Sequence, residues 1–442
     1  MNRTDEQPFL EAIFDRYEDD RPRLIYADFL DDAGQPERAE LIRVQIALAH
    51  LDDNDPRRSF LLDRQAELLH HNRNVWIQPL ARWVVGIDFR RGIPDSVTVH
   101  ATTFLHHGSE LMQRLPIRRL RLLEVNPVID KLFCCPLLAQ LRELDVCGAE
   151  LGDAGVQRLA QCAHWKQLTT LDLGFNGLSD QGVVALARSA SMPQLATLAL
   201  NDNDQITSDG LEALANSATF AALRHLDVSG NDIDERGLAA VVASPVMARL
   251  QSLRCNANRI GDAGIAVLTS SHLLARWLAV EKALVLRDNA IGPAGAQQLA
   301  YCPALAQCRT LDLSNNYLGD AGIAALLRSP YLTRLKVMRL ARNQLTDNGV
   351  AAVHEPLQRL LDQLTLLDVS HNRLTRLGLA LLDILKGQRP VQLERADNVQ
   401  AAPAGDAPVA VAELLPDVMA SVTDAARLKH RIAHPRNASD RL

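Results

Sequence analysis

Apolar residues recur along this chain with the spacing L-x-x-L-x-L-x-x-N-x-L/I, nine times between Leu141 and Leu374. Examples are LTTLDLGFNGL from Leu168, LRHLDVSGNDI from Leu223 and LTLLDVSHNRL from Leu364. Side chains alternate along a strand, so the fourth and sixth residues of a unit face the same side. Successive units begin at nearly constant intervals. This period predicts a stack of strand-plus-helix units, each buried by its neighbours.

The segment after each strand predicts a turn and then a helix. Eight of the nine units carry asparagine in the same slot, and we expect these side chains to bond main-chain groups of adjacent turns. Segments such as GDAG at Gly261–Gly264 and SDQG at Ser179–Gly182 follow, and their aspartates are expected to cap the first turn of the helix that begins there in the same repeat. Apolar residues then recur at three- and four-residue spacing, as a helix requires. Parallel strands should line the concave side of a curved solenoid, and helices its convex side.

This pattern resembles the ribonuclease-inhibitor class of leucine-rich repeats, whose units have this length and carry helices on the outside. The resemblance covers roughly Val97 to Leu385. Two degenerate units lie upstream, IRRLRLLEV from Ile117 and SVTV at Ser96–Val99. Their cores fit the pattern without the asparagine, which is typical of an N-terminal cap.

The segment 1–75 differs from the repeats and predicts a small bundle of helices. Amphipathic patterns and prolines place these helices near residues 6–17, 21–34, 36–51 and 57–71. We expect the bundle to cover the open end of the solenoid.

The run PRLIYADFLDDAGQPERAELIRVQIALA resembles a repeat-companion domain found in bacteria ahead of leucine-rich repeats. The following IDFRRGIPDSVTV resembles the junction that these proteins share. The resemblance implies an architecture and no activity. The matching residues are Arg23, Leu24, Tyr26, Ala27, Asp28, Leu30, Gly34, Arg38, Glu40, Ile42, Arg43, Gln45, Phe89, Arg90, Arg91 and Gly92.

Four charged residues of this run, Asp28, Arg38, Glu40 and Arg43, allow two interpretations. A cluster of carboxylates and guanidinium groups could bind phosphate or a peptide. Alternatively, it forms ion pairs and caps inside the module, which is the interpretation we favour.

The predicted fold class is therefore α/β: a curved leucine-rich-repeat solenoid preceded by a small all-α N-terminal module. Four regions are expected: a helical repeat-companion module (1–75), degenerate capping repeats (76–140), leucine-rich repeats (141–387), and a linker with a weakly ordered tail (388–442).

Composition narrows the classes of function. A net charge of −6 and a pI near 6.1 argue against a nucleic-acid binder. The seven cysteines show no CxxC and no histidine at zinc spacing, so we expect reduced, buried thiols and no metal or cofactor. The N-terminus has no secretory pattern and no apolar run approaches a membrane span, which predicts a cytoplasmic protein without membrane contact. The resemblance to the repeat-companion domain implies a bacterial protein, and we expect a monomer.

A search for catalytic motifs gives nothing: the chain has no phosphate-binding glycine loop, no HExxH and no G-x-S-x-G. We therefore expect that the protein is not an enzyme.

Charged residues next to the strand leucines are the candidate binding site. Asp-rich strands could merely keep the inner face soluble, but a collective mixed-charge array favours docking of a protein partner. The predicted partner-binding residues are Arg119, Arg121, Asp145, Asp172, Asp227, Arg254, Arg287, Asp312, Arg339 and Asp368.

The predicted function is a non-catalytic interaction scaffold with a protein partner of unknown identity. The alternative is a regulator of a small GTPase, because repeats of this type include GTPase activators of the Ran kind. Those proteins typically carry a strongly acidic C-terminal stretch, whereas the tail from Gln388 holds seven acidic and seven basic side chains. Fold alone does not decide between the two.

Overall fold

The computed structural model describes residues 6–51, 55–78, 80–115 and 117–398. They divide into two compact units. Unit 1 comprises Met1–Asn203 with Ser217–Leu223, and unit 2 comprises Asp204–Asn216 with Arg224–Leu442.

Unit 1 begins with a four-helix module; three helices lie close to the predicted positions, and the fourth, predicted to end near residue 71, continues to Ile77. One core cluster includes Ile13, Tyr26 and Ile42, and a second includes Leu41 and Leu68. The third helix contributes to both clusters, so its buried residues are not confined to one face. The helices are α1 (Gln7–Asp15), α2 (Arg21–Asp32), α3 (Pro36–His50) and α4 (Arg57–Ile77).

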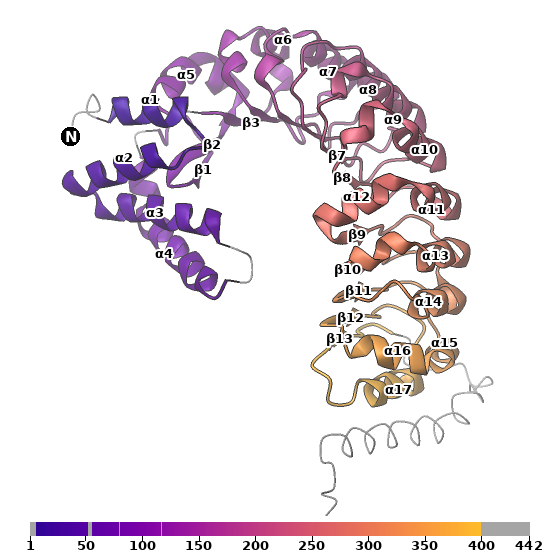
Figure 1. Ribbon diagram of the computed structural model, residues 1–442. Helices are drawn as coiled ribbons and strands as arrows, with labels where there is room; N and C mark the ends of the chain where they lie inside the picture. Colours follow the sequence, from indigo (N-terminus) through magenta and orange to yellow (C-terminus); the bar gives the residue numbers. More distant parts are fainter. Residues whose placement is uncertain (1–5, 52–54, 79, 116, 399–442) are drawn as a thin grey trace, which may run out of the picture. The chain divides into compact units, whose positions relative to one another are not determined.

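A sheet follows the module in unit 1. An antiparallel hairpin opens it, and each later strand is parallel to the one before. Its helices lie on the opposite side of each repeat from the strands (Figure 1). The strands are β1 (Gly86–Arg90), β2 (Ile93–His100), β3 (Arg119–Leu123), β4 (Glu143–Asp145), β5 (Thr170–Asp172) and β6 (Thr197–Ala199); the helices are α5 (Ala101–Arg114), α6 (Ile129–Phe133), α7 (Gly152–Gln161) and α8 (Asp180–Ala187).

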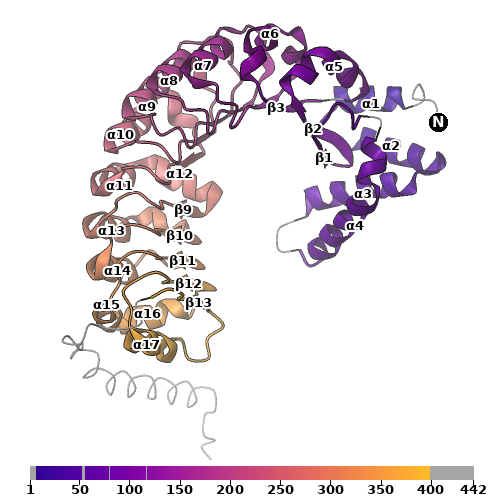
Figure 2. The same cartoon turned by 180° about the vertical axis from the view of Figure 1, so that it is seen from behind.

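Unit 2 continues the same alternation of strand and helix. Its strands also lie on one side of the repeats and most of its helices on the other, as the view from behind shows (Figure 2). The exception is α12, which lies next to β8 and β9. We call the two sides the strand face and the helix face. The strands are β7 (His225–Asp227), β8 (Ser252–Arg254), β9 (Ala283–Val285), β10 (Thr310–Asp312), β11 (Val337–Arg339), β12 (Leu366–Asp368) and β13 (Gln392–Glu394). The helices are α9 (Ser208–Ala215), α10 (Glu235–Ala243), α11 (Gly261–Ser270), α12 (His272–Glu281), α13 (Pro293–Ala300), α14 (Gly319–Leu327), α15 (Asp347–Ala352), α16 (His354–Leu361) and α17 (Arg376–Lys386).

These elements confirm the predicted fold class, parallel repeat strands and outer helices preceded by a small all-α module. Repeat structure also extends beyond Gly387, further than the sequence pattern indicates. Strand β13 pairs in parallel with β12, and the side chain of Asn398 accepts a hydrogen bond from the amide of Asn372 (3.1 Å). Residues 388–398 lack the leading leucines of the other units, which hides them in the pattern. The rest of the predicted linker and tail, 399–442, lies outside the described residues.

The asparagine ladder is confirmed. Asn316 accepts from the amides of Asn289 and Ile291 (both 3.0 Å) and donates to the carbonyls of Leu286 (3.0 Å) and Leu313 (2.9 Å). One buried side chain thus satisfies main-chain groups in two consecutive turns, where no ladder of strand bonds can reach.

One helix-side aspartate caps its own helix, as predicted: Asp234 accepts from the amide of Arg236 in α10 (2.9 Å). Others act on the next repeat instead. Asp153, in the first turn of α7, accepts from the amides of Ser179 and Gly182 (both 2.9 Å), at the start of α8. Asp320 and Asp347 likewise bond Thr346 and Thr375 of the next repeat. The cap therefore crosses from repeat to repeat, because stacking brings the next helix N-terminus within reach of the carboxylate.

Candidate partner-binding groove

The strand face of unit 1 carries a groove of about 530 Å³, lined by strands β1 to β5. The strand register sorts its side chains into two rows that run across the sheet. Row A is Ser96–Arg119–Glu143–Thr170, and row B is Thr98–Arg121–Asp145–Asp172. Neighbouring strands lie about 4.8 Å apart, so adjacent members of a row can interact.

Row A is organised by Arg119, which bridges two carboxylates. Its Nε lies 2.9 Å from Asp95 Oδ2, and its Nη2 lies 2.9 Å from Glu143 Oε1. Asp95 is only 3% exposed, and burial raises the pKa of its carboxyl to about 6 in spite of the nearby Arg119. Burial also raises the pKa of Glu143. One oxygen of the buried Asp95 carboxylate, Oδ1, has no hydrogen-bond partner among the described residues.

Row B is more exposed. Arg121 lies 3.6 Å from Asp145, and about half of the Arg121 side chain remains accessible. Asp145 uses its other oxygen to accept from the amide of Cys147 (2.9 Å). One oxygen of the Asp145 carboxylate thus bonds the turn at the end of the strand, and the other lies near Arg121 in the groove.

Arg90, at the end of β1, adds a cation to the groove rim. No ion pair or hydrogen bond of its side chain is found within residues 80–115 and the other described ranges. Burial, and then the positive charge of Arg119, lowers the pKa of this guanidinium. The groove therefore presents cations and carboxylates side by side.

On the strand face of unit 2, the predicted residues form no comparable cluster within the described ranges. Arg254 lies 3.9 Å from Asp227 and is 70% exposed, and Arg287 is exposed as well. Arg339 is half-buried, with Asp312 and Asp368 as its register neighbours on either side. Those two aspartates are 6% and 8% exposed, so they offer little surface to a partner.

The strand aspartates share a local role. In each of them one carboxylate oxygen accepts from the amide two residues further on, at 2.9 to 3.0 Å. This bond closes the turn at the end of the strand and explains why the sequence repeats Asp at this position. The residues are Asp145, Asp172, Asp227, Asp312 and Asp368.

Sequence reasoning missed Asp95 and Glu143, the two acids of the groove whose pKa burial raises. Apart from Arg119, the candidate set was drawn from positions between and after the two strand leucines, whereas Glu143 comes directly before the first of them. The residue after the second leucine is a poor candidate where it is buried, as at Gly174 and Ser314, because the chain turns there. Reading the residue before the first leucine would have found Glu143.

The charged motif of the N-terminal module forms internal ion pairs. Arg43 contacts Asp28 (2.6 Å) and Asp31 (2.7 Å), and Glu40 contacts Arg64 (2.7 Å). Arg38 contacts Glu6 (3.2 Å). The favoured interpretation, a network inside the module, matches this geometry.

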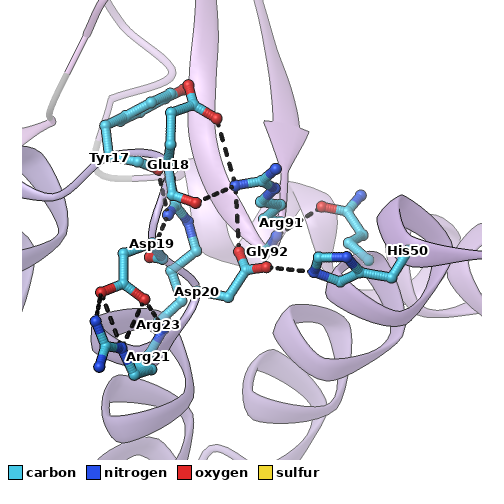
Figure 3. Close-up of polar contacts among 10 residues, drawn as sticks. Tyr17, Glu18, Asp19, Asp20, Arg21, Arg23, His50, Arg91 and Gly92 are labelled. Carbon is cyan, nitrogen blue, oxygen red and sulfur yellow. Dashed lines mark hydrogen bonds and ion pairs between the residues drawn. The ribbon is translucent and has the colours of Figure 1, made fainter.

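Other residues of the motif fasten the module to the β1–β2 hairpin, as Figure 3 shows. Arg91, in the hairpin turn, lies 3.3 Å from Asp20, which also contacts His50 (2.7 Å). Arg23 is 2% exposed and donates to the carbonyl oxygens of Tyr17 (2.5 Å) and Asp19 (3.1 Å). These side chains act on the backbone and on one another, which indicates a structural joint.

Other chemistry is limited within the described ranges. No group of three or more His, Cys, Asp or Glu side chains there could hold a metal ion. The seven cysteines are free thiols, and burial raises the pKa of Cys255 to about 12 and that of Cys308 to about 11. No single described helix is long and apolar enough to cross a membrane; only α11 and α12 together pass that test, and they are bent by 85°.

Comparison with known proteins agrees with the fold. The family described as Leucine Rich repeat matches residues 167–187, 193–215, 222–242 and 309–327. A search of curated protein sequences found no match. Together with the strand-plus-helix units, the four matched segments define a leucine-rich-repeat protein, a class that generally serves as a protein-interaction scaffold.

Two solved structures show a weaker likeness. An internalin from Listeria monocytogenes is 18% identical, with 61% of this chain and 79% of that chain covered and a TM-score of 0.36. A chain of the Rad7 and Elc1 complex from yeast is 14% identical, with 83% and 94% covered and a TM-score of 0.48. At these values neither structure assigns a partner or an activity to this chain.

The buried Asp95 carboxyl predicts a pH effect on stability. Its pKa rises from 3.8 to about 6 on folding, so the folded chain holds a proton that the unfolded chain has lost between these pH values. Its contribution to stability is therefore present at low pH and lost as the pH rises through about 6. Relative to Asp95→Asn, the wild type should lose up to about 3 kcal/mol between pH 4 and pH 7. Denaturant unfolding of both proteins at several pH values measures their free energies of unfolding. A difference between the two proteins that does not change with pH would contradict the prediction.

Proposed function

We propose that this protein is a non-catalytic interaction scaffold that binds a protein partner in the strand-face groove of unit 1. The observation that carries the proposal is the Asp95–Arg119–Glu143 array. Its buried carboxylate has an oxygen without a partner among the described residues, and it lies beside the cations Arg90 and Arg121. Such a desolvated polar array is costly for a folded chain unless something satisfies it.

The charges indicate the chemistry of the partner surface. A lysine or an arginine of the partner can pair with Glu143 and Asp145, whose side chains are about one third exposed. A carboxylate on the partner can meet Arg90 and Arg121. A mixed-charge surface is therefore the expected complement, since opposite potentials orient the partner and speed its association.

Several finer features belong to this proposal. We assign the repeats to the ribonuclease-inhibitor type, because each unit is long enough to carry a helix such as α8 or α7 after its strand. We assign the helical module to the bacterial repeat-companion type, because its motif residues form the joint with the β1–β2 hairpin. We further propose a cytoplasmic monomer.

Charge reversal in the groove tests the proposal. Arg90→Glu and Arg121→Glu should each weaken capture of the partner from native lysate by about tenfold, because each puts a carboxylate where the partner's acid docks. Arg188→Glu is the matched control: it makes the same change at an exposed position after α8 on the helix face, and should bind normally. Quantitative mass spectrometry of the captured proteins gives the comparison. Equal capture by all three variants and the wild type would exclude this groove as the binding site.

Activation of a small GTPase stays a separate hypothesis that no contact in the described residues favours. A GTP hydrolysis assay with candidate GTPases distinguishes it, because a scaffold leaves the hydrolysis rate unchanged.

A further inference from the structure

The sheet of unit 2 is split between β8 and β9. In the described chain, β7 pairs with β8 and β9 to β13 form a continuous parallel sheet, but no ladder joins β8 to β9. Main-chain bonds resume only after the strands, where the amide of Ala257 donates to Arg287 O (2.8 Å). The two strands therefore diverge along their length and meet again at the following turn.

The cause of the split is an additional helix. The step from Leu250 to Glu281 is longer than the preceding step from Leu223 to Leu250, and the extra length forms α12. Most other repeats have only a short turn at this place; α16, before β12, is the other α-helix there among the described residues. Helix α12 packs against both strands. Its Trp277 donates to Leu250 O (3.1 Å), and its Arg276 donates to Ala248 O, so the helix is fastened to the preceding repeat.

A cleft of about 420 Å³ lies in the split, which we call the β8–β9 cleft. Its walls are apolar and include Leu253 and Leu284 from the strands and Leu274, Trp277 and Leu278 from α12. Leu253 occupies the same register position as the buried Leu226 of β7, yet it is partly exposed. The cleft thus opens the core of the repeat stack to the strand face.

Both walls of the cleft are strand edges that no described strand pairs with. Ser252 and Arg254 direct their main-chain groups toward β7, because Ser252 N donates to Arg224 O (3.0 Å) and Arg254 O accepts from Val228 N (2.8 Å). Direction alternates along a strand, so the main-chain groups of Leu253 face the cleft, and so does the amide of Cys255. The carbonyl of Cys255 already accepts from the Asn289 side chain (3.0 Å). On β9, Leu286 N donates to Asp312 O of β10 (2.9 Å), so the main-chain groups of Ala283 and Val285 face the cleft.

We propose that the β8–β9 cleft binds an extended peptide segment with apolar side chains at alternate positions. A peptide backbone supplies donors and acceptors to both free edges, and every second side chain enters the apolar interior. The charges at the rim, Asp227, Arg254 and Glu281, do not sum to a positive site, so the cleft does not favour an anionic head group. This site is separate from the groove of unit 1, and either proposal can fail without the other.

A pair of variants at one register position isolates the cleft. Ala283 lines the cleft, whereas Val337 lies at the equivalent position of β11, which is paired on both sides. Both residues are half-buried on the strand face. Ala283→Trp should block the cleft, and Val337→Trp should add the same kind of bulk where the sheet is closed.

The experiment selects peptides from a displayed random library on the full chain and measures their affinity for both variants. We expect selected peptides that alternate apolar and polar residues, bind Ala283→Trp about tenfold more weakly and bind Val337→Trp normally. They should also slow amide hydrogen exchange at Leu253, Cys255, Ala283 and Val285. Equal binding to Ala283→Trp, or slow exchange of these amides before any peptide is added, overturns the proposal. A library that yields no peptide able to bind the full chain would overturn it too.

Discussion

Replacing Asn316 by alanine is expected to lower the free energy of unfolding by about 4 kcal/mol or more, because four main-chain groups lose a buried bond. The side chain accepts from two buried amides, of Asn289 and Ile291, and donates to two carbonyls, of Leu286 and Leu313. A buried main-chain group that loses its only partner costs about 1–3 kcal/mol, and alanine can replace none of these bonds. The carbonyl of Leu313 keeps a second donor, the side chain of Asn343 (2.8 Å), so the loss falls mainly on the other three groups. Denaturant unfolding followed by circular dichroism measures the loss.

Asn289→Ala is the matched control, in the repeat next to it. Asn289 is equally buried and donates to the carbonyls of Cys255 (3.0 Å) and Arg287 (2.9 Å). Its Oδ1, however, accepts no bond from the described residues, because the split between β8 and β9 shifts the turn before it. Its replacement frees no amide and should cost about 2 kcal/mol or less. Equal losses at the two positions would show that the ladder does not distinguish them.

The second large effect is expected at Gly92, in the joint between the helical module and the β1–β2 hairpin. A Cβ atom there would lie 2.3 Å from the backbone Cα of Ile42, and φ is +76°. The Gly92 amide also donates to Gln45 Oε1 (2.6 Å), so α3 cannot withdraw without losing this bond. Gly92→Ala should therefore lower the free energy of unfolding by about 3 kcal/mol or more. It should also raise the rate at which proteases cleave the α1–α4 module. Denaturant unfolding and limited proteolysis measure the two effects.

Gly34→Ala separates backbone strain from contact. Gly34 has almost the same φ, +74°, but nothing lies within 4 Å of its Cβ position. Gly34→Ala should lower the free energy of unfolding by only about 1 kcal/mol, the cost of a non-glycine residue in the left-handed conformation. If both variants lose the same amount, the module does not depend on the close approach to Ile42.

The fold was predictable where every repeat places the same type of residue in the same surroundings. Periodic leucines and asparagines predicted the strands, the outer helices and the ladder, because each position has the same surroundings in every unit. Contacts to a residue that the repeat pattern does not mark were harder to predict. Asp153 lies at the start of its own helix in the sequence, yet it caps the helix that begins near Ser179, and only the stacking of units decides this.

The candidate groove was only partly predictable for the same reason. Arg119, Arg121, Asp145 and Asp172 were selected from the strand pattern, and they do line one groove. Asp95 contributes through its burial, which depends on the packing of the hairpin and has no local sequence pattern. The cleft between β8 and β9 was visible only as a repeat of unusual length.

The split also bears on how the molecule responds to mechanical load. The repeats that carry β10 and β11 are joined by a strand ladder and by asparagine side chains. Among the described residues, the repeats that carry β8 and β9 have no strand ladder between them, and Asn289 Oδ1 accepts no hydrogen bond. If unit 2 is stretched by its two ends in an optical trap, the first rip should fall between these two repeats, and the strands from β9 onward should hold to a higher force.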